Sequence, residues 1–122
     1  MTIRALNPFG PDWYTPISER DKPEGIPRTR FKLCGLDGEQ LGYVAPEMLF
    51  DESGKNFRGV TGRGVTFALQ YGLVDWENFA NDRGSIPFSP LNFKLIEYSL
   101  RCELATHIIA ASHVSADEKK TS

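Results

Sequence analysis

The sequence predicts a compact, mainly α-helical domain with a small β element, an α+β fold, preceded by an extended Pro-rich N-terminal arm. Residues 60–73 and 93–111 both carry apolar side chains every three or four positions, which is the period of an amphipathic helix. Five prolines lie between positions 8 and 27, and no regular helix fits there because each removes a backbone donor and restricts the preceding residue. We therefore divide the 122 residues into an arm (1–27), a globular domain (28–113) and a polar, flexible tail (114–122).

The arm is too apolar to be a simple linker. It carries Phe9, Trp13 and Tyr14 among its prolines, and large aromatic side chains are costly to leave in water. We expect these three residues to pack either on the core of the same chain or on a neighbouring subunit. They are therefore the candidate contacts to a partner.

The segment after the arm begins with a predicted strand. Residues 28–36 alternate charged and apolar side chains, the period of a half-buried strand. Asp37 and Gly38 follow as a turn signal. Residues 39–50 are ambiguous, because they fit either a second strand or a short helical turn opened by Pro46. Residues 51–56 form a polar turn.

Two helices account for most of the predicted regular structure. The first runs over about three turns, with Thr61 as its N-cap and Gly72 as its glycine cap. The second opens with Ser89 as N-cap and Pro90 at the first helical position, although Asn92 is a rival cap. Its apolar periodicity predicts an end near Ser112.

The segment between these helices is predicted to be an aromatic corner, which we define as Trp76, Phe79 and Phe88. Trp76 and Phe79 are three residues apart and are assigned to one side of a short helical turn. Residues 81–84 then form a turn that brings Phe88 back over the rings. In a small domain such a cluster is more often core than ligand pocket, so we assign the corner a structural role.

Composition and motifs argue against several classes of function. The net charge of −2 with well-mixed charges disfavours nucleic-acid binding, and no apolar run approaches the roughly 18 residues of a membrane span. Two cysteines, Cys34 and Cys102, favour a reducing cytoplasm over a disulfide framework. Cys102, His107 and His113 are spaced by five and six, which does not bring metal ligands to one helical face. Residues 59–64 lack the Gly-Lys-Ser/Thr ending of a phosphate loop. No enzyme activity, metal or cofactor is predicted.

The order of the later motifs resembles the small tail assembly chaperones of long-tailed, siphovirus-like bacteriophages. The similarity covers about residues 28–122 and is most specific over 72–109, whereas the arm has no clear counterpart. The residues that carry it are Gly72-Leu73, Val74-x-Trp76-x-Asn78-Phe79, the turn at Gly84, Pro87-Phe88-Ser89 and Glu103-Leu104-Ala105-x-x-Ile108.

The resemblance implies a non-enzymatic protein of the host bacterial cytoplasm. Such chaperones bind and solubilise the tape measure protein during tail assembly, and self-association is expected. Several members make a longer product by programmed ribosomal slippage, and that extension is thought to recruit the tail tube protein. Lys119 and Lys120 can be encoded by a run of adenines, which would suit such slippage. Neither a nucleic acid nor a membrane is implied as a partner.

Two other interpretations remain open. The first is another phage structural or completion protein, such as a head–tail or tail terminator subunit, because that class shares the size, the acidity and the arm. The second is a small ligand-binding domain or enzyme that uses Asp75, Glu77 and Asp82 around the aromatic corner.

Overall fold

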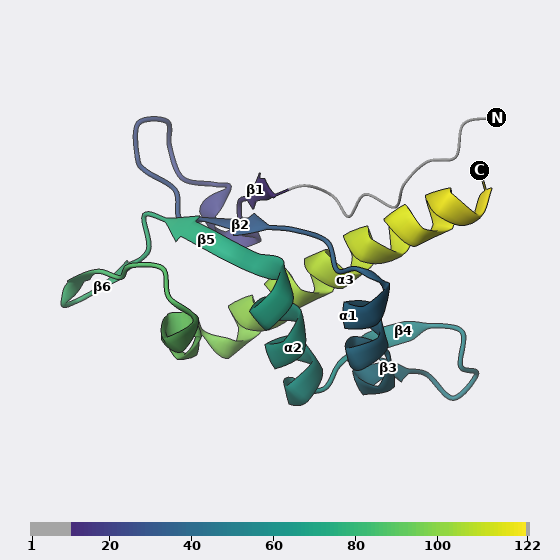
Figure 1. Ribbon diagram of the computed structural model, residues 1–122. Helices are drawn as coiled ribbons and strands as arrows, with labels where there is room; N and C mark the ends of the chain where they lie inside the picture. The colour runs from purple at the N-terminus through teal and green to yellow at the C-terminus, as the bar shows by residue number, and fades with distance from the viewer. Residues whose placement is uncertain (1–10, 122) are drawn as a thin grey trace.

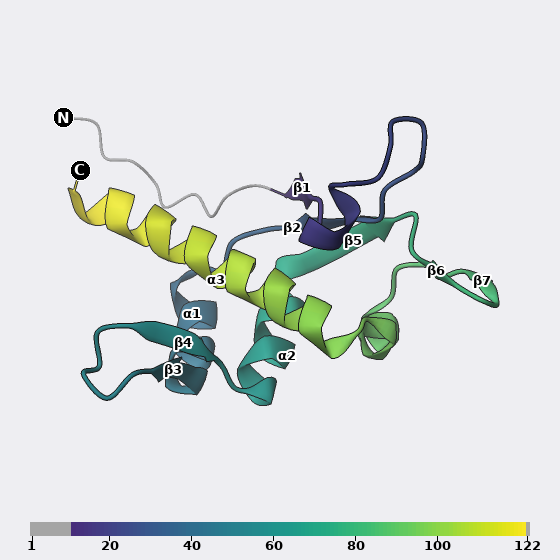
Figure 2. The same ribbon diagram turned by 180° about the vertical axis from the view of Figure 1, so that it is seen from behind.

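The computed structural model describes residues 11–121, with the side chains among them given as far as Ser112. Figures 1 and 2 show the chain from opposite sides. The elements in chain order are β1 (Asp12–Tyr14), the 3₁₀ helix η1 (Ile17–Glu19), β2 (Arg30–Leu33), α1 (Gly38–Val44), the 3₁₀ helix η2 (Ala45–Glu47), β3 (Met48–Phe50), β4 (Phe57–Val60), α2 (Gly62–Gly72), β5 (Leu73–Glu77), β6 (Ala80–Asn81), β7 (Gly84–Ser85), the 3₁₀ helix η3 (Pro90–Leu95) and α3 (Tyr98–Thr121).

Helices and strands are mixed along the chain, so the prediction of a mainly α-helical fold is wrong. The strands form one three-stranded antiparallel sheet of order β1-β2-β5 and two two-stranded sheets, β3-β4 and β6-β7. Each strand has five residues or fewer. Period-two alternation is hard to recognise over so few positions, and β1 also lies in the Pro-rich arm.

The three-stranded sheet joins the arm to the middle of the chain. β2 is the strand expected within residues 28–36, and it pairs with β1 on one side and β5 on the other. Phe31 on β2 is opposite Tyr14 on β1 and Trp76 on β5. Directly opposite residues point to the same face of a sheet, so this row places three aromatic rings toward the body of the protein.

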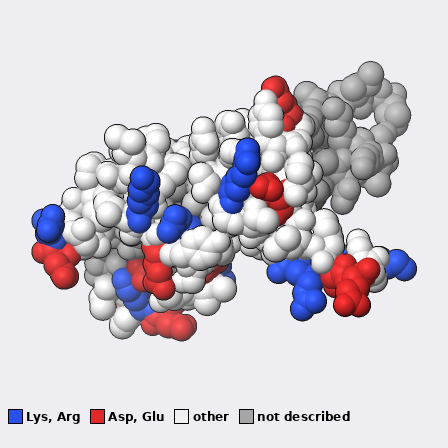
Figure 3. Space-filling view, turned by 90° about the horizontal axis from the view of Figure 1, so that it is seen from below, with Lys and Arg blue, Asp and Glu red and all other residues white. Residues whose placement is uncertain are grey.

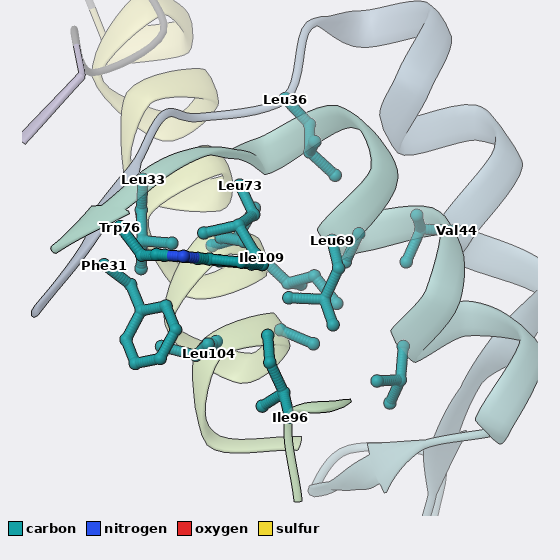
Figure 4. Packing of buried hydrophobic residues seen from close by; sticks show 14 of the residues in the cluster. Phe31, Leu33, Leu36, Val44, Leu69, Leu73, Trp76, Ile96, Leu104 and Ile109 are labelled. Carbon is teal, nitrogen blue, oxygen red and sulfur yellow. The ribbon is translucent and has the colours of Figure 1, made fainter. Parts of the chain in front are cut away.

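The hydrophobic core lies between this sheet face and the two longer helices. Phe31 and Trp76 from the sheet meet Leu69 of α2 and Leu104 of α3, with Ile96 closing the lower side (Figure 4). α2 and α3 pack directly against each other. Because residues between Tyr14 and Ile109 contribute to one core, the described residues 11–112 form a single structural unit.

α2 confirms the predicted first helix and its end at Gly72, but Gly72 does not have the predicted role of a glycine cap. The Thr61 side chain caps the helix by accepting from Gly64 N at 3.2 Å. Gly72 is the last helical residue rather than a glycine cap, and Leu73 continues directly into an extended strand. A Cβ at Gly72 would lie 2.7 Å from both the Cδ1 and the Cγ2 of Ile108. Glycine is therefore required here for the close approach of α3.

α1 replaces the turn predicted at Asp37-Gly38. Asp37 Oδ1 accepts from Gln40 N at 2.8 Å, and the Gln40 side chain accepts from Asp37 N at 3.1 Å. This reciprocal capping box starts a helix. Asp followed by Gly fits both a turn and a helix start, and Gln40 three residues later is the feature that favours the helix.

β5 replaces the short helical turn predicted for Trp76 and Phe79. Trp76 lies within the strand, whereas Phe79 follows Asn78, whose φ of 55° ends the extended run. The expected turn at residues 81–84 is confirmed as the tip of the β6–β7 hairpin.

The C-terminal helix begins later and extends further than predicted. Ser89 does cap a helix beginning at Pro90, but this is the 3₁₀ helix η3, and the extended residue Ile96 ends it. α3 starts at Tyr98 and continues to Thr121. Lys119 and Lys120 lie beyond the described side chains.

A buried hydrogen-bond pair connects α3 to the first half of the chain. Ser112 Oγ accepts from Leu36 N at 2.7 Å and donates to Ile108 O at 2.6 Å. Ser112 is the buried polar residue of the described core, and both of its bonds are made within the chain. Within residues 11–121, no helix has the length and hydropathy required to cross a bilayer.

Candidate functional site

The structure brings the three residues of the aromatic corner together. The Trp76 ring lies 5.0 Å from the rings of both Phe79 and Phe88, and both contacts are edge-on. Trp76 is only 6% exposed, and its Nε1–H donates to Ile86 O at 2.7 Å. The polar atom of the Trp76 ring is thus satisfied by the backbone.

The carboxylates near the corner point away from it. Asp75 and Glu77 flank Trp76 along β5, and successive residues of a strand face opposite sides of the sheet. Asp75 Oδ1 accepts from the Trp76 backbone N at 2.8 Å, while Glu77 pairs with Arg30 on β2. Asp82 lies in the β6–β7 turn.

The arm residues Trp13 and Tyr14 are successive in β1, so their side chains point to opposite faces of the sheet. Trp13 lies on the outer face of the sheet and is 37% exposed, with the cationic groups of Arg30 and Lys32 at 5.1 and 5.7 Å from its ring. Tyr14 points to the opposite side, toward α3. Phe9 lies outside the described residues. Of these three candidate contacts, Trp13 is the described one that is accessible.

Tyr14 is held by a carboxylate that fixes the arm at two points. Glu103 Oε2 accepts from Tyr14 Oη at 2.6 Å and from Ile17 N at 3.0 Å. Burial and the adjacent Glu103 raise the pKa of Tyr14 to about 12. The His107 ring lies 4.4 Å from the Tyr14 ring, and burial together with the nearby Arg20 lowers the pKa of this imidazole. In this structure, residues 12–17 of the arm therefore pack on α3 of the same chain.

Beside this anchor lies an open groove of about 610 Å³ between the arm and the outer face of α3. Cys102, Glu103 and His107 line it together with small residues of α3. The described residues include no group of three or more His, Cys, Asp or Glu side chains arranged to hold a metal ion, and the side chain of His113 lies outside them. Burial raises the pKa of the other thiol, Cys34, which makes it a weaker nucleophile. The geometry here anchors a segment of the arm on α3.

The accessible features of the body are apolar surfaces that sequence reasoning missed. We define the hairpin patch as Phe50 and Phe57 on β3–β4, and the helix-start patch as Leu91, Leu95 and Tyr98 on η3 and the start of α3. All five side chains are substantially exposed, and Leu91 is 86% exposed. Both sets of elements lie on the lower side of the molecule in Figures 1 and 2. From below, charges of both signs are scattered over a mostly uncharged surface (Figure 3).

The hairpin patch has a clear structural origin. Met48 and Val60 are opposite each other and pack against the core, and two residues further along the same strand Phe50 is opposite Phe57. Their rings are 6.1 Å apart. The apolar face of the hairpin therefore continues beyond the body that covers its base. The signal in the sequence was a pair of apolar runs around the polar turn at 51–56, which predicts a hairpin when read together.

No family model, no curated protein and no solved structure matches this chain.

Proposed function

We propose that this chain is a tail assembly chaperone of a long-tailed bacteriophage, which binds and solubilises the tape measure protein in the host bacterial cytoplasm without catalysis. The motif resemblance over residues 72–109 supports the family. The observation that carries the mechanism is the exposed apolar surface divided between the hairpin patch and the helix-start patch. Apolar groups that remain exposed in contiguous patches commonly mark protein-binding sites.

The two patches suit a long helical client better than a compact ligand. A tape measure segment presents apolar helix faces, and these can bind exposed apolar side chains of a partner. Each contact alone is weak, but contacts repeated along one client molecule gain strength through effective concentration. A chaperone of this kind needs accessible surface and no deep pocket.

Co-expression with the tape measure protein of the same phage tests the proposal. We expect the chain to keep the client soluble and to co-purify with it. Leu91→Asp should reduce co-purification because it places a carboxylate in the helix-start patch. Asn81→Asp is the matched control, since it adds the same charge in the exposed β6–β7 turn and keeps the Oδ1 acceptor that binds Arg83 N.

Two outcomes would contradict the proposal. One is a client that is equally soluble without the chain. The other is a purified chain that forms discrete rings and has no affinity for the client, which would favour a tail terminator or head–tail completion subunit.

Contact with the tail tube protein is proposed to require a longer, frameshifted form. Expression from the native coding DNA with its downstream flank should then give a minor, longer product. Mass spectrometry should place the divergence near Lys119 and Lys120, and synonymous codons that interrupt the adenine run should remove this product.

A further inference from the structure

An arginine near the start of α3 carries a buried donor without an acceptor. Arg101 is the fourth residue of this helix and is only partly exposed. Its Nε is the one buried side-chain nitrogen or oxygen among the described residues that has no hydrogen-bond partner. None of the ion pairs between described residues includes Arg101. An unpaired buried donor costs free energy, so the position of this side chain requires an explanation.

The neighbouring residues of α3 do not compensate the charge of Arg101. Glu97, one turn earlier, accepts from Ser99 Oγ at 3.0 Å, and the first turn of α3 contains no acidic residue. A cation near the N-terminus of a helix is also unfavourable, because it faces the positive end of the helix dipole. Side chains that lower the stability of the free protein are concentrated at functional sites.

The guanidinium group of Arg101 is placed beside exposed apolar side chains. Its Cζ lies 5.3 Å from the centre of the Tyr98 ring, and Tyr98 belongs to the helix-start patch and is 50% exposed. The Tyr98 hydroxyl reaches the start of α2, where a Cβ added to Gly62 would lie 3.5 Å from it. Arginine and tyrosine are enriched among the residues that dominate binding energy at protein interfaces.

The charge of this segment favours an acidic partner. Residues 90–101 carry Lys94 and Arg101 against Glu97, so the segment is net positive in a chain whose net charge is −2. A guanidinium group can bind a carboxylate through two parallel hydrogen bonds. This pairing is stronger where apolar neighbours exclude water. The matching segment therefore carries a carboxylate beside its own apolar side chains.

We propose that Arg101 binds a carboxylate of the client, and that the segment bound by the helix-start patch is an acidic amphipathic helix. The apolar face of this helix contacts Leu91, Leu95 and Tyr98, while an aspartate or glutamate beside that face pairs with Arg101. This inference rests on the proposed function, because it names the chemistry of the client segment. It adds a requirement for charge to a surface that is otherwise apolar.

Two synthetic helical peptides test this recognition without the client. Both carry leucines every three or four residues; one has glutamates beside the leucine face, and the other has glutamines at the same positions. In fluorescence anisotropy at low ionic strength, the wild type should bind the glutamate peptide about tenfold more tightly, because charge-assisted pairs are the stronger ones. Added salt should reduce this preference.

Arg101→Met separates a binding role from a structural one. Methionine keeps a long, unbranched side chain and removes both the unpaired donor and the cation. The variant should therefore bind the two peptides equally, with a thermal midpoint equal to or above that of the wild type. Arg101→Lys should bind the glutamate peptide with intermediate strength, since it keeps the charge but loses the planar fork. Lys94→Met is the matched control, because it removes the same charge from an exposed site in the same segment and should retain most of the preference.

The inference is overturned if the wild type binds both peptides equally, or if Arg101→Met keeps the preference for glutamate. A fall in the thermal midpoint of Arg101→Met would overturn it as well, since Arg101 would then be a structural residue. So would equal co-purification of the tape measure protein with Arg101→Met and with Lys94→Met. A wild type that prefers the glutamate peptide but leaves the tape measure protein insoluble would overturn the proposed function instead, and Arg101 would remain an anchor for carboxylates.

Discussion

Replacing Gly72 by alanine places a methyl group in the contact between α2 and α3. The added carbon would lie 2.7 Å from two atoms of Ile108 and 3.1 Å from Cys34 O. The two helices and the start of β5 must move apart to accept it, and overpacking of this kind costs about 1–3 kcal/mol. For a domain of this size that corresponds to a fall of roughly 3–5 °C in melting temperature per kcal/mol.

Urea denaturation of four variants measures this effect. Gly42→Ala is the matched control, because it makes the same change in a helix where the new methyl group meets nothing, and it should stabilise by about 0.5–1 kcal/mol. Ile108→Ala alone should destabilise by about 2–5 kcal/mol. In the double variant, Ile108→Ala removes the atoms that clash with the new methyl group. The double variant should therefore lose less unfolding free energy than the sum of the two single losses. A Gly72→Ala protein as stable as the wild type, or strictly additive effects, would refute the reasoning.

Two further predictions concern the aromatic corner and the arm. Trp76→Phe removes the donor to Ile86 O and should lower the free energy of unfolding by about 2–3 kcal/mol. Trp13→Phe on the exposed outer face should change it by less than about 0.5 kcal/mol. Equal effects of the two variants in chemical denaturation would contradict the structural role of the aromatic corner. The raised pKa of Tyr14, from 10.0 to about 12, means that its contribution to stability is complete below pH 10 and is lost as the pH rises toward 12. Tyr14→Phe should therefore show a shallower loss of stability over this range than the wild type, and parallel curves would exclude the anchor at Glu103.

Local signals in the sequence were sufficient to predict the elements that depend on capping and periodicity alone. Thr61 before an apolar period of three to four predicts α2, and alternation predicts β2, because capping and periodicity act within a few residues. The same reasoning failed at Trp76. Its spacing from Phe79 fits a helical turn, but pairing with Phe31 on β2 makes this segment a strand. Pairing of distant segments is a tertiary effect, and it outweighs a weak local pattern.

The candidate surfaces could not be predicted from the sequence for a related reason. Nothing in the spacing of Phe50 and Phe57 shows that the hairpin extends past the core, because that depends on where the body ends. Likewise, Tyr14 and Glu103 are 89 positions apart. The sequence could identify Tyr14 as an aromatic residue needing a partner, but only the fold shows that the partner lies on α3 of the same chain.

The hydrogen bond between Leu36 and Ser112 has a consequence for synthesis of the protein. The amide of Leu36 and the core face of β2 have no permanent cover until the helix that carries Ser112 has left the ribosome. The nascent chain therefore emerges with its first two thirds unable to complete a core, and long-range contacts of this kind form late in folding. Folding factors that shield apolar nascent segments would thus act on this chain throughout its translation.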